Sequence, residues 1–100
     1  MKKKTTPERF NTICDTLYEM VRRVHKLTNK RVGFEVMKFD GEKLGVYSAL
    51  TVAVRGEGRS AEFYDICDLF NDDAEKAFEK VKERLNGILS ETSEQDKKGE

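Results

Sequence analysis

The stretch VGFEVMKFDGEKLGVYSALTVAVR, residues 32–55, decides the fold of this chain. Its first part, residues 32–39, carries β-branched and aromatic side chains with a period near two, which is typical of a β-strand. Asp40 and Gly41 follow, and this pair predicts a tight hairpin turn because glycine accepts a positive φ without a Cβ clash. A second strand should then run over residues 43–55. We therefore predict an antiparallel hairpin.

The second predicted strand has two different faces. One is strongly apolar and consists of Leu44, Val46, Ser48, Leu50, Val52 and Val54. The other carries small and mixed side chains, among them Tyr47, Ala49, Thr51 and Ala53. A sheet packs its apolar face on a hydrophobic core, so we expect helices to cover the first face and to leave the second open. The length and alternation of residues 43–55 place this strand at the centre of the sheet.

Helical periodicity occurs on both sides of the hairpin. Before it, Thr6 can cap a helix and Pro7 can occupy its first position, after which apolar residues recur at spacings of three and four as far as residue 29. After it, Asn71 or Asp72 can cap a second helix over residues 72–90. Both helices are predicted to be amphipathic and to contribute one face to the core.

Residues 61–70, AEFYDICDLF, fit two templates. As a strand, they place Tyr64 and Ile66 opposite to Phe63 and Cys67. As a helix, they form an apolar stripe that continues into the last helix. The strand is favoured because the preceding segment RGEGRS, residues 55–60, has the length of a hairpin loop, and because two strands alone make too small a sheet.

The predicted fold class is α+β, an α-β-β-β-α domain with an antiparallel three-stranded meander sheet and two helices on one face. One hundred residues suffice for one small domain, which we assign to residues 7–90. Residues 1–6 are predicted to be a flexible basic N-terminus, and residues 91–100, which contain no apolar side chain, a disordered polar tail. The expected core includes Phe10, Leu17, Val21, Val46, Leu50, Val52, Phe78, Val81 and Leu85.

The sequence predicts a non-catalytic protein without a cofactor. Its single histidine, His25, lies eleven residues from Cys14 on the same predicted helix, about 16 Å away, which is too far for a catalytic dyad. Cys14, His25 and Cys67 are too few and too scattered for structural zinc, so no metal site is expected. We expect both cysteines to be buried free thiols of a cytoplasmic protein, and no apolar run has the length that a membrane span needs.

Charge is balanced over the whole chain, with 19 basic and 19 acidic residues, but it is segregated along it. Residues 1–31 carry nine basic and three acidic groups, a net +6, and residues 61–100 carry six and twelve, a net −6. The acidic half predicts a partner-binding face, which would dock on a protein or imitate nucleic acid in a basic cleft. Its residues are Glu57, Glu62, Asp65, Asp68, Asp72 and Asp73.

The basic end of the first helix is the alternative binding region. Arg22, Arg23, Lys26, Lys30 and Arg31 would meet a nucleic-acid backbone. Glu19 partly neutralises this group, and the helix dipole itself favours cations at a C-terminus, so nucleic acid is not the favoured partner. The element order is also that of double-stranded-RNA-binding domains, but those begin their last helix with lysines where this chain has NDDAEK, residues 71–76, and we transfer no residue from them.

The leading functional prediction is a small protein–protein interaction module, an accessory or inhibitory protein that docks through its sheet or its acidic half. The open sheet face with Tyr47, Ala49, Thr51 and Ala53 is not polar enough to remain solvated. A thin core also gains stability from a second copy. We therefore predict a homodimer formed through this face, with a different protein covering the same face as the alternative.

Overall fold

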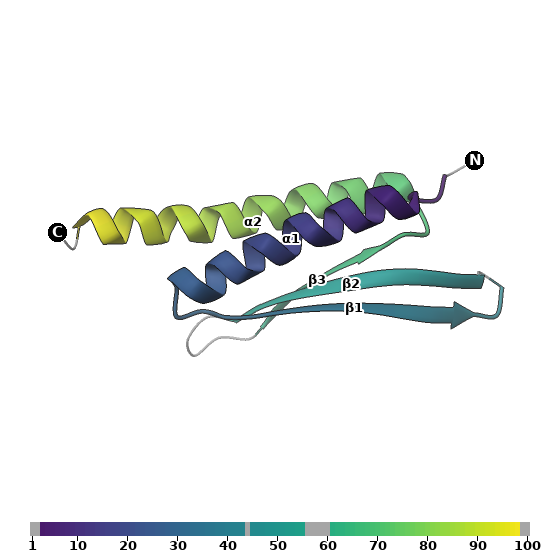
Figure 1. Cartoon of the computed structure of the whole chain (residues 1–100), viewed down its shortest axis with the longest axis horizontal. Coiled ribbons are helices and arrows are strands. Elements are labelled where there is room, and N and C mark those ends of the chain that lie inside the picture. Colours follow the sequence, from purple (N-terminus) through teal and green to yellow (C-terminus); the bar gives the residue numbers. More distant parts are fainter. Residues whose placement is uncertain (1–2, 44, 56–60, 99–100) are drawn as a thin grey trace.

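The computed structural model describes residues 3–43, 45–55 and 61–98, with side chains as far as residue 91. Along the chain it contains α1 (Pro7–Leu27), β1 (Arg31–Gly41), β2 (Gly45–Arg55), β3 (Glu62–Cys67) and α2 (Asn71–Lys98). The sheet is antiparallel with the order β1-β2-β3, and both helices lie on one of its faces (Figure 1). The predicted α+β architecture is confirmed, including the strand within residues 61–70 and the central position of β2.

Helix α1 begins and ends with hydrogen bonds that its sequence supplies. The Thr6 hydroxyl accepts from the Arg9 backbone N–H at 3.1 Å, and Pro7 occupies the first turn, where no amide hydrogen is needed. At the other end, both the backbone N–H and the hydroxyl of Thr28 donate to the Val24 carbonyl. The helix therefore ends at Leu27, within two residues of the predicted end.

The hairpin between β1 and β2 turns later than predicted. Gly41 is still paired, opposite Gly45, so the turn lies after Gly41 and not at Asp40 and Gly41. Among the described residues, Gly45 has the positive φ, 73°, that the sequence analysis assigned to Gly41. Hairpin turns commonly require a residue in the left-handed region, and glycine adopts it without strain.

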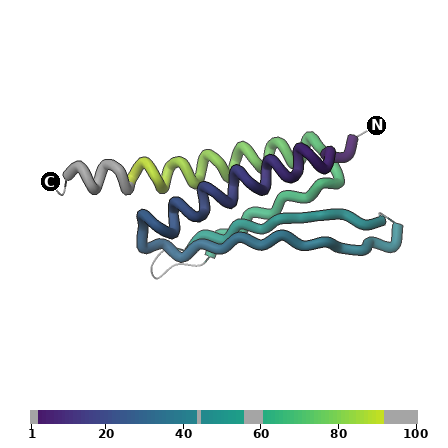
Figure 2. Tube along the Cα trace, viewed as in Figure 1, coloured from purple at the N-terminus to yellow at the C-terminus, as the bar shows by residue number. Residues whose placement is uncertain are grey.

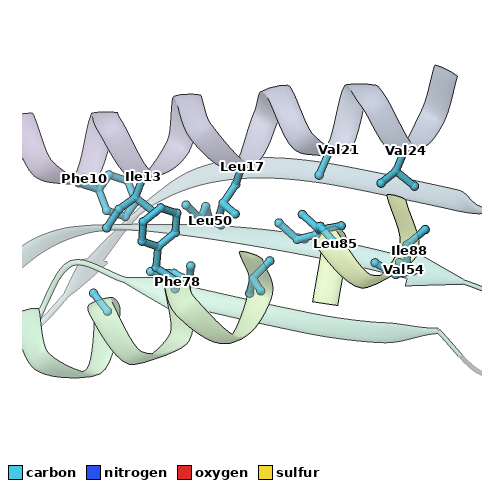
Figure 3. Close-up of a cluster of buried hydrophobic side chains, with 14 residues drawn as sticks. Phe10, Ile13, Leu17, Val21, Val24, Leu50, Val54, Phe78, Leu85 and Ile88 are labelled. Atoms are coloured by element: carbon cyan, nitrogen blue, oxygen red, sulfur yellow. The ribbon is translucent and has the colours of Figure 1, made fainter. Parts of the chain in front are cut away.

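The core lies between the two helices and the covered face of the sheet (Figure 3). Side chains from α1, such as Leu17 and Val24, meet Leu85 and Ile88 of α2 and Leu50 of β2. Every predicted core residue is buried except one. Val46 is 60% exposed because it lies beside the hairpin turn, and the hairpin extends past the beginnings of both helices (Figure 1).

The N-terminal segment is held against the turn that connects β3 to α2. The Thr5 N–H donates to the Asp68 carbonyl at 2.9 Å, and the Lys3 carbonyl accepts from the Asn71 N–H at 2.7 Å, so it satisfies the first amide of α2. Thr5 itself is buried. Two backbone hydrogen bonds therefore join the N-terminal segment to the turn between β3 and α2. Figure 2 shows the N-terminal segment at the end of the molecule where α2 begins.

Helix α2 continues through Lys98, beyond the end predicted at residue 90 and across most of the predicted polar tail. Glu, Gln and Lys are good helix formers, so a helix that is anchored by packing at Phe78, Leu85 and Ile88 propagates into a polar segment by local hydrogen bonds. None of the helices in the described part of the chain combines the length and the apolar character needed to cross a membrane.

Candidate functional site

The face of the sheet opposite the helices has no element of the described chain packed on it (Figure 1). Residues that pair across antiparallel strands point to the same face, so the register identifies its members. We call this surface the uncovered face. Its members are Arg31, Gly33, Glu35, Met37 and Phe39 of β1, Tyr47, Ala49, Thr51, Ala53 and Arg55 of β2, and Phe63, Asp65 and Cys67 of β3.

These residues form rows that run across the strands and alternate in chemistry. The basic row is Arg31 opposite Arg55, the middle row is Gly33, Ala53 and Phe63, and the acidic row is Glu35, Thr51 and Asp65. An apolar row of Met37, Ala49 and Cys67 follows, and Phe39 opposite Tyr47 completes the face towards the hairpin turn. Charged side chains of this face therefore lie only in the basic and acidic rows, and the middle row separates these two rows.

Large apolar side chains of the uncovered face meet solvent. Phe63 is 67% exposed, Met37 43% and Phe39 38%. The Phe39 ring stacks on Tyr47 with ring centroids 5.2 Å apart, so the hairpin end carries a preformed aromatic pair. Met37 and Phe39 are neighbours along β1, whereas Phe63 lies on β3, on the other side of β2. Exposed apolar residues that lie next to one another mark binding surfaces.

The predicted sheet-face residues come together as expected, and β1 and β3 add neighbours to them. Tyr47, Ala49, Thr51 and Ala53 all lie on the uncovered face and are half-buried by the flanking strands. The Thr51 hydroxyl donates to Asp65 Oδ1 at 2.6 Å. Sequence reasoning missed Met37, Phe39 and Phe63, although the alternation in β1 and β3 that it recognised would have placed them here.

The predicted acidic residues do not form one face. Glu62 and Asp65 are three positions apart in β3, so they lie on opposite sides of the sheet. Glu62 accepts from Arg84 Nε and from the Tyr64 hydroxyl, both at 2.9 Å, and the Arg84 hydrogen bond lowers the pKa of this carboxyl, with Tyr64 adding to the effect. Asp72 and Asp73 are exposed in the first turn of α2, where the helix dipole favours them. Glu57 lies outside the described residues.

Asp68 has a structural use that the sequence did not reveal. Its Oδ1 accepts from the Ser48 N–H and its own N–H donates to the Ser48 carbonyl, both at 3.0 Å. Its carbonyl accepts from Thr5. This residue therefore joins β2, the end of β3 and the N-terminal segment, and its carboxylate is engaged inside the domain.

The basic end of α1 forms an open depression that is separate from the uncovered face, which we call the basic depression. Its lining consists of Tyr18, Glu19, Arg22, Arg23, His25 and Lys26. The Arg22 guanidinium lies 5.9 Å from the centroid of the Tyr18 ring, which in turn packs edge-on against Phe34 of β1. Three of the five predicted basic residues therefore line one depression. Arg31 lies instead in the basic row of the sheet, and Lys30 is half-buried between α1 and β1.

The residues with nucleophilic or ligating side chains are dispersed. Cys14 and Cys67 are both unpaired and half-buried, on opposite sides of the sheet, so they are less buried than predicted. Burial, with a smaller contribution from Asp15, raises the pKa of the Cys14 thiol to about 11, so it is protonated at neutral pH. Within the described residues no three His, Cys, Asp or Glu side chains are grouped so that they could hold a metal ion.

A basic residue of the first third of the chain pairs with an acidic residue of the last part within the domain. Arg9 of α1 forms a two-pronged pair with Glu75 of α2, with both N–O distances at 2.6 Å, and its guanidinium lies 5.3 Å from the Phe78 ring centroid. The Arg9 hydrogen bond lowers the pKa of Glu75. The basic first third and the acidic last part of the chain are thus in contact through neighbouring helices, and this contact aligns α1 with α2.

Comparisons with known proteins give no relative from which a function can be transferred. No family model matches the chain. No curated protein and no solved structure is significantly similar to it.

Proposed function

We propose that this chain is a non-catalytic interaction module, an accessory or inhibitory protein that binds another protein through the uncovered face. One observation carries the proposal: both helices pack on the same side of the sheet, while the other side presents Met37, Phe39 and Phe63 to solvent. Burying such side chains against a partner removes apolar surface from water, which is the main driving force of protein association.

The composition of the uncovered face supports this assignment. Aromatic residues, methionine and arginine are enriched in protein interfaces, and all three occur here, with Phe39, Tyr47 and Phe63 as the aromatic members. Thr51 and Asp65 are joined by a hydrogen bond, so the polar centre of the face is ordered before a partner binds. We also propose a cytoplasmic location, which the unpaired Cys14 and Cys67 support, because disulfides are rare in a reducing compartment.

Nucleic-acid binding is the second candidate, because Arg22, Arg23 and Lys26 line the same depression as Tyr18. Such an arrangement offers cations to a phosphate backbone and a ring on which a base could stack. Glu19 lies in the depression too and opposes an anionic ligand. The basic depression therefore ranks behind the uncovered face.

Position-specific photocrosslinking in cells tests the proposal. A photoreactive phenylalanine derivative is placed at Phe63 on the uncovered face, at Arg23 in the basic depression or at Lys80, which is exposed on α2. We expect a protein adduct of defined mass from position 63 and none from position 80. Position 80 is the matched control because it is equally available to random collisions.

The outcomes separate the two candidates. A protein adduct from position 63 alone supports the interaction module, and an adduct with nucleic acid from position 23 supports the alternative. If position 63 gives no adduct, or if all three positions give the same adducts, the uncovered face is not a specific interface. Digestion of the adduct with nuclease or protease identifies the class of partner.

A further inference from the structure

We propose that the partner on the uncovered face is a second copy of this chain, packed face to face about a two-fold axis that crosses the strands at the middle row. This inference rests on the proposed function and specifies its partner. It assigns a role to the order of the basic, middle and acidic rows, which the general proposal leaves unused. In this arrangement the basic row of each copy lies against the acidic row of the other.

The geometry follows from the spacing of the rows. Side chains on one face of a strand are two residues apart, so adjacent rows are separated by about 6.8 Å. A two-fold axis over the middle row exchanges the basic and acidic rows. The rows of Met37 and Phe39 extend past the sheet of the second copy, because β1 begins at Arg31 and β2 ends at Arg55. Arg31 of one copy then faces Glu35 of the other, and Arg55 faces Thr51 beside Asp65. Each contact occurs twice, because a two-fold interface is self-complementary.

Two other symmetric arrangements bring like charges together. An axis over the acidic row would place Glu35 against Glu35 and Asp65 against Asp65. An axis parallel to the strands would place the arginines of the basic row against those of the second copy. Like charges that face each other across an interface are strongly unfavourable. Among axes that run along a row, only the one over the middle row sets the basic row of one copy against the acidic row of the other.

The side chains of the middle row also suit a position on the axis. Gly33 and Ala53 are small, so the two sheets can approach to the spacing of about 10 Å that is usual for stacked sheets. Phe63, the most exposed of the large apolar side chains in the described residues, would lie beside Phe63 of the second copy. Arg31, Glu35 and Arg55 form no ion pair within the described chain, which leaves their charges available to a partner.

Charge reversal tests the arrangement. Arg31→Glu and Glu35→Arg each place like charges together at two symmetric contacts, so each variant alone should raise the dissociation constant of the dimer at least about tenfold. The double variant Arg31→Glu/Glu35→Arg recreates the pair in reversed order and should return to within about threefold of wild type. Sedimentation equilibrium gives the three constants, and circular dichroism verifies that each variant is folded.

The rescue has no explanation within one chain. Residues 31 and 35 lie four positions apart on one strand, about 13 Å from each other, which is too far for a direct contact. Lys80→Glu and Glu83→Arg are the matched controls, since they make the same charge changes at exposed positions of α2 and should leave the dissociation constant unchanged.

The outcomes distinguish this inference from the function on which it rests. A dimer that both single variants weaken and the double variant restores supports it. A dimer that is indifferent to the single variants, or that the double variant fails to restore, overturns the arrangement. If the wild-type chain is a monomer while position 63 crosslinks to a different protein, the proposed dimer is wrong. The proposal that the chain is an interaction module is then still supported. A monomer without such an adduct contradicts both.

Discussion

Strand β3 carries Ile66 and Phe63 three residues apart, on opposite faces of the same sheet, and the two side chains have opposite environments. Ile66 is 1% exposed beneath the helices, whereas Phe63 is 67% exposed on the uncovered face. Hydrophobicity alone does not distinguish them. The difference lies in what covers each face, since both helices of the described residues pack on the same side of the sheet. The proposed partner would cover the apolar side chains of the other side.

The largest expected effect comes from truncating this pair of residues in turn. Ile66→Ala should lower the free energy of unfolding by about 2 to 5 kcal/mol because it leaves a cavity in the core. Phe63→Ala removes more carbon atoms but should cost less than about 1 kcal/mol in the dilute monomer, where its ring is solvated. Urea unfolding at low protein concentration measures both. Equal losses would show that the two faces do not differ in the way described.

The second comparison is between two acidic residues near the end of β3. Asp68→Ala removes the acceptor of the Ser48 N–H and should destabilise the domain by about 1 to 3 kcal/mol, and Asp68→Asn, which keeps an oxygen acceptor, should recover most of this. Asp65→Ala on the uncovered face should change stability by less than about 0.5 kcal/mol. Thermal or urea unfolding measures the free energy of unfolding of the three variants. An Asp68→Ala variant as stable as wild type would show that the hydrogen bond from the Ser48 N–H to Asp68 does not stabilise the domain.

A smaller effect concerns pH on the helix side. Because Arg9 lowers the pKa of Glu75, the ionised form is favoured in the folded state, and this contribution is present above the ordinary value of 4.5 and is lost as pH falls below it. Glu75→Gln should therefore reduce the difference in urea midpoint between pH 7 and pH 3. Glu83→Gln, at an exposed position of α2 and without an ion pair among the described residues, is the control. A Glu75→Gln variant with the pH profile of wild type would mean that the pair with Arg9 is not formed in solution.

The smallest expected effect is at Thr5. Its hydroxyl is buried and has no hydrogen-bond partner within the described residues, so Thr5→Val, which keeps the shape of the side chain, should be neutral or stabilise the domain by up to about 1 kcal/mol. Thermal unfolding measures this. A clear loss of stability would indicate that the hydroxyl is satisfied by solvent, and that the N-terminal segment is packed less tightly than described.

The sequence was sufficient to predict the element order, the central strand and nearly all of the core, because these depend on periodicity. Leu50, Val52 and Val54 alternate along β2 and are buried as predicted. Val46 belongs to the same alternation but is exposed, because periodicity defines a face and does not reveal how far the helices extend over it. The turn position was missed because Asp40 and Gly41 carry a strong local turn signal, while the register of the strands places the positive φ at Gly45.

The candidate site could be predicted only in part for a similar reason. Tyr47, Ala49, Thr51 and Ala53 were identified from one strand, whereas the rows that give the face its charge pattern require the register of all three. The acidic residues looked continuous along the chain, but strand alternation divides Glu62 from Asp65, and Asp68 is engaged by Ser48. Long-range hydrogen bonds of this kind leave no local signal in a sequence.

Sedimentation equilibrium of the wild-type chain and of Ala53→Lys at micromolar concentration tests the central claim most directly. Ala53 lies in the middle row, on the proposed axis, and its side chain points away from the core, so a lysine there should leave the fold intact while placing two like charges together at the centre of the interface. The account predicts twice the chain mass of 11.5 kDa for wild type and the single mass for Ala53→Lys. A monomeric wild-type chain, or a dimer that survives Ala53→Lys, would contradict it.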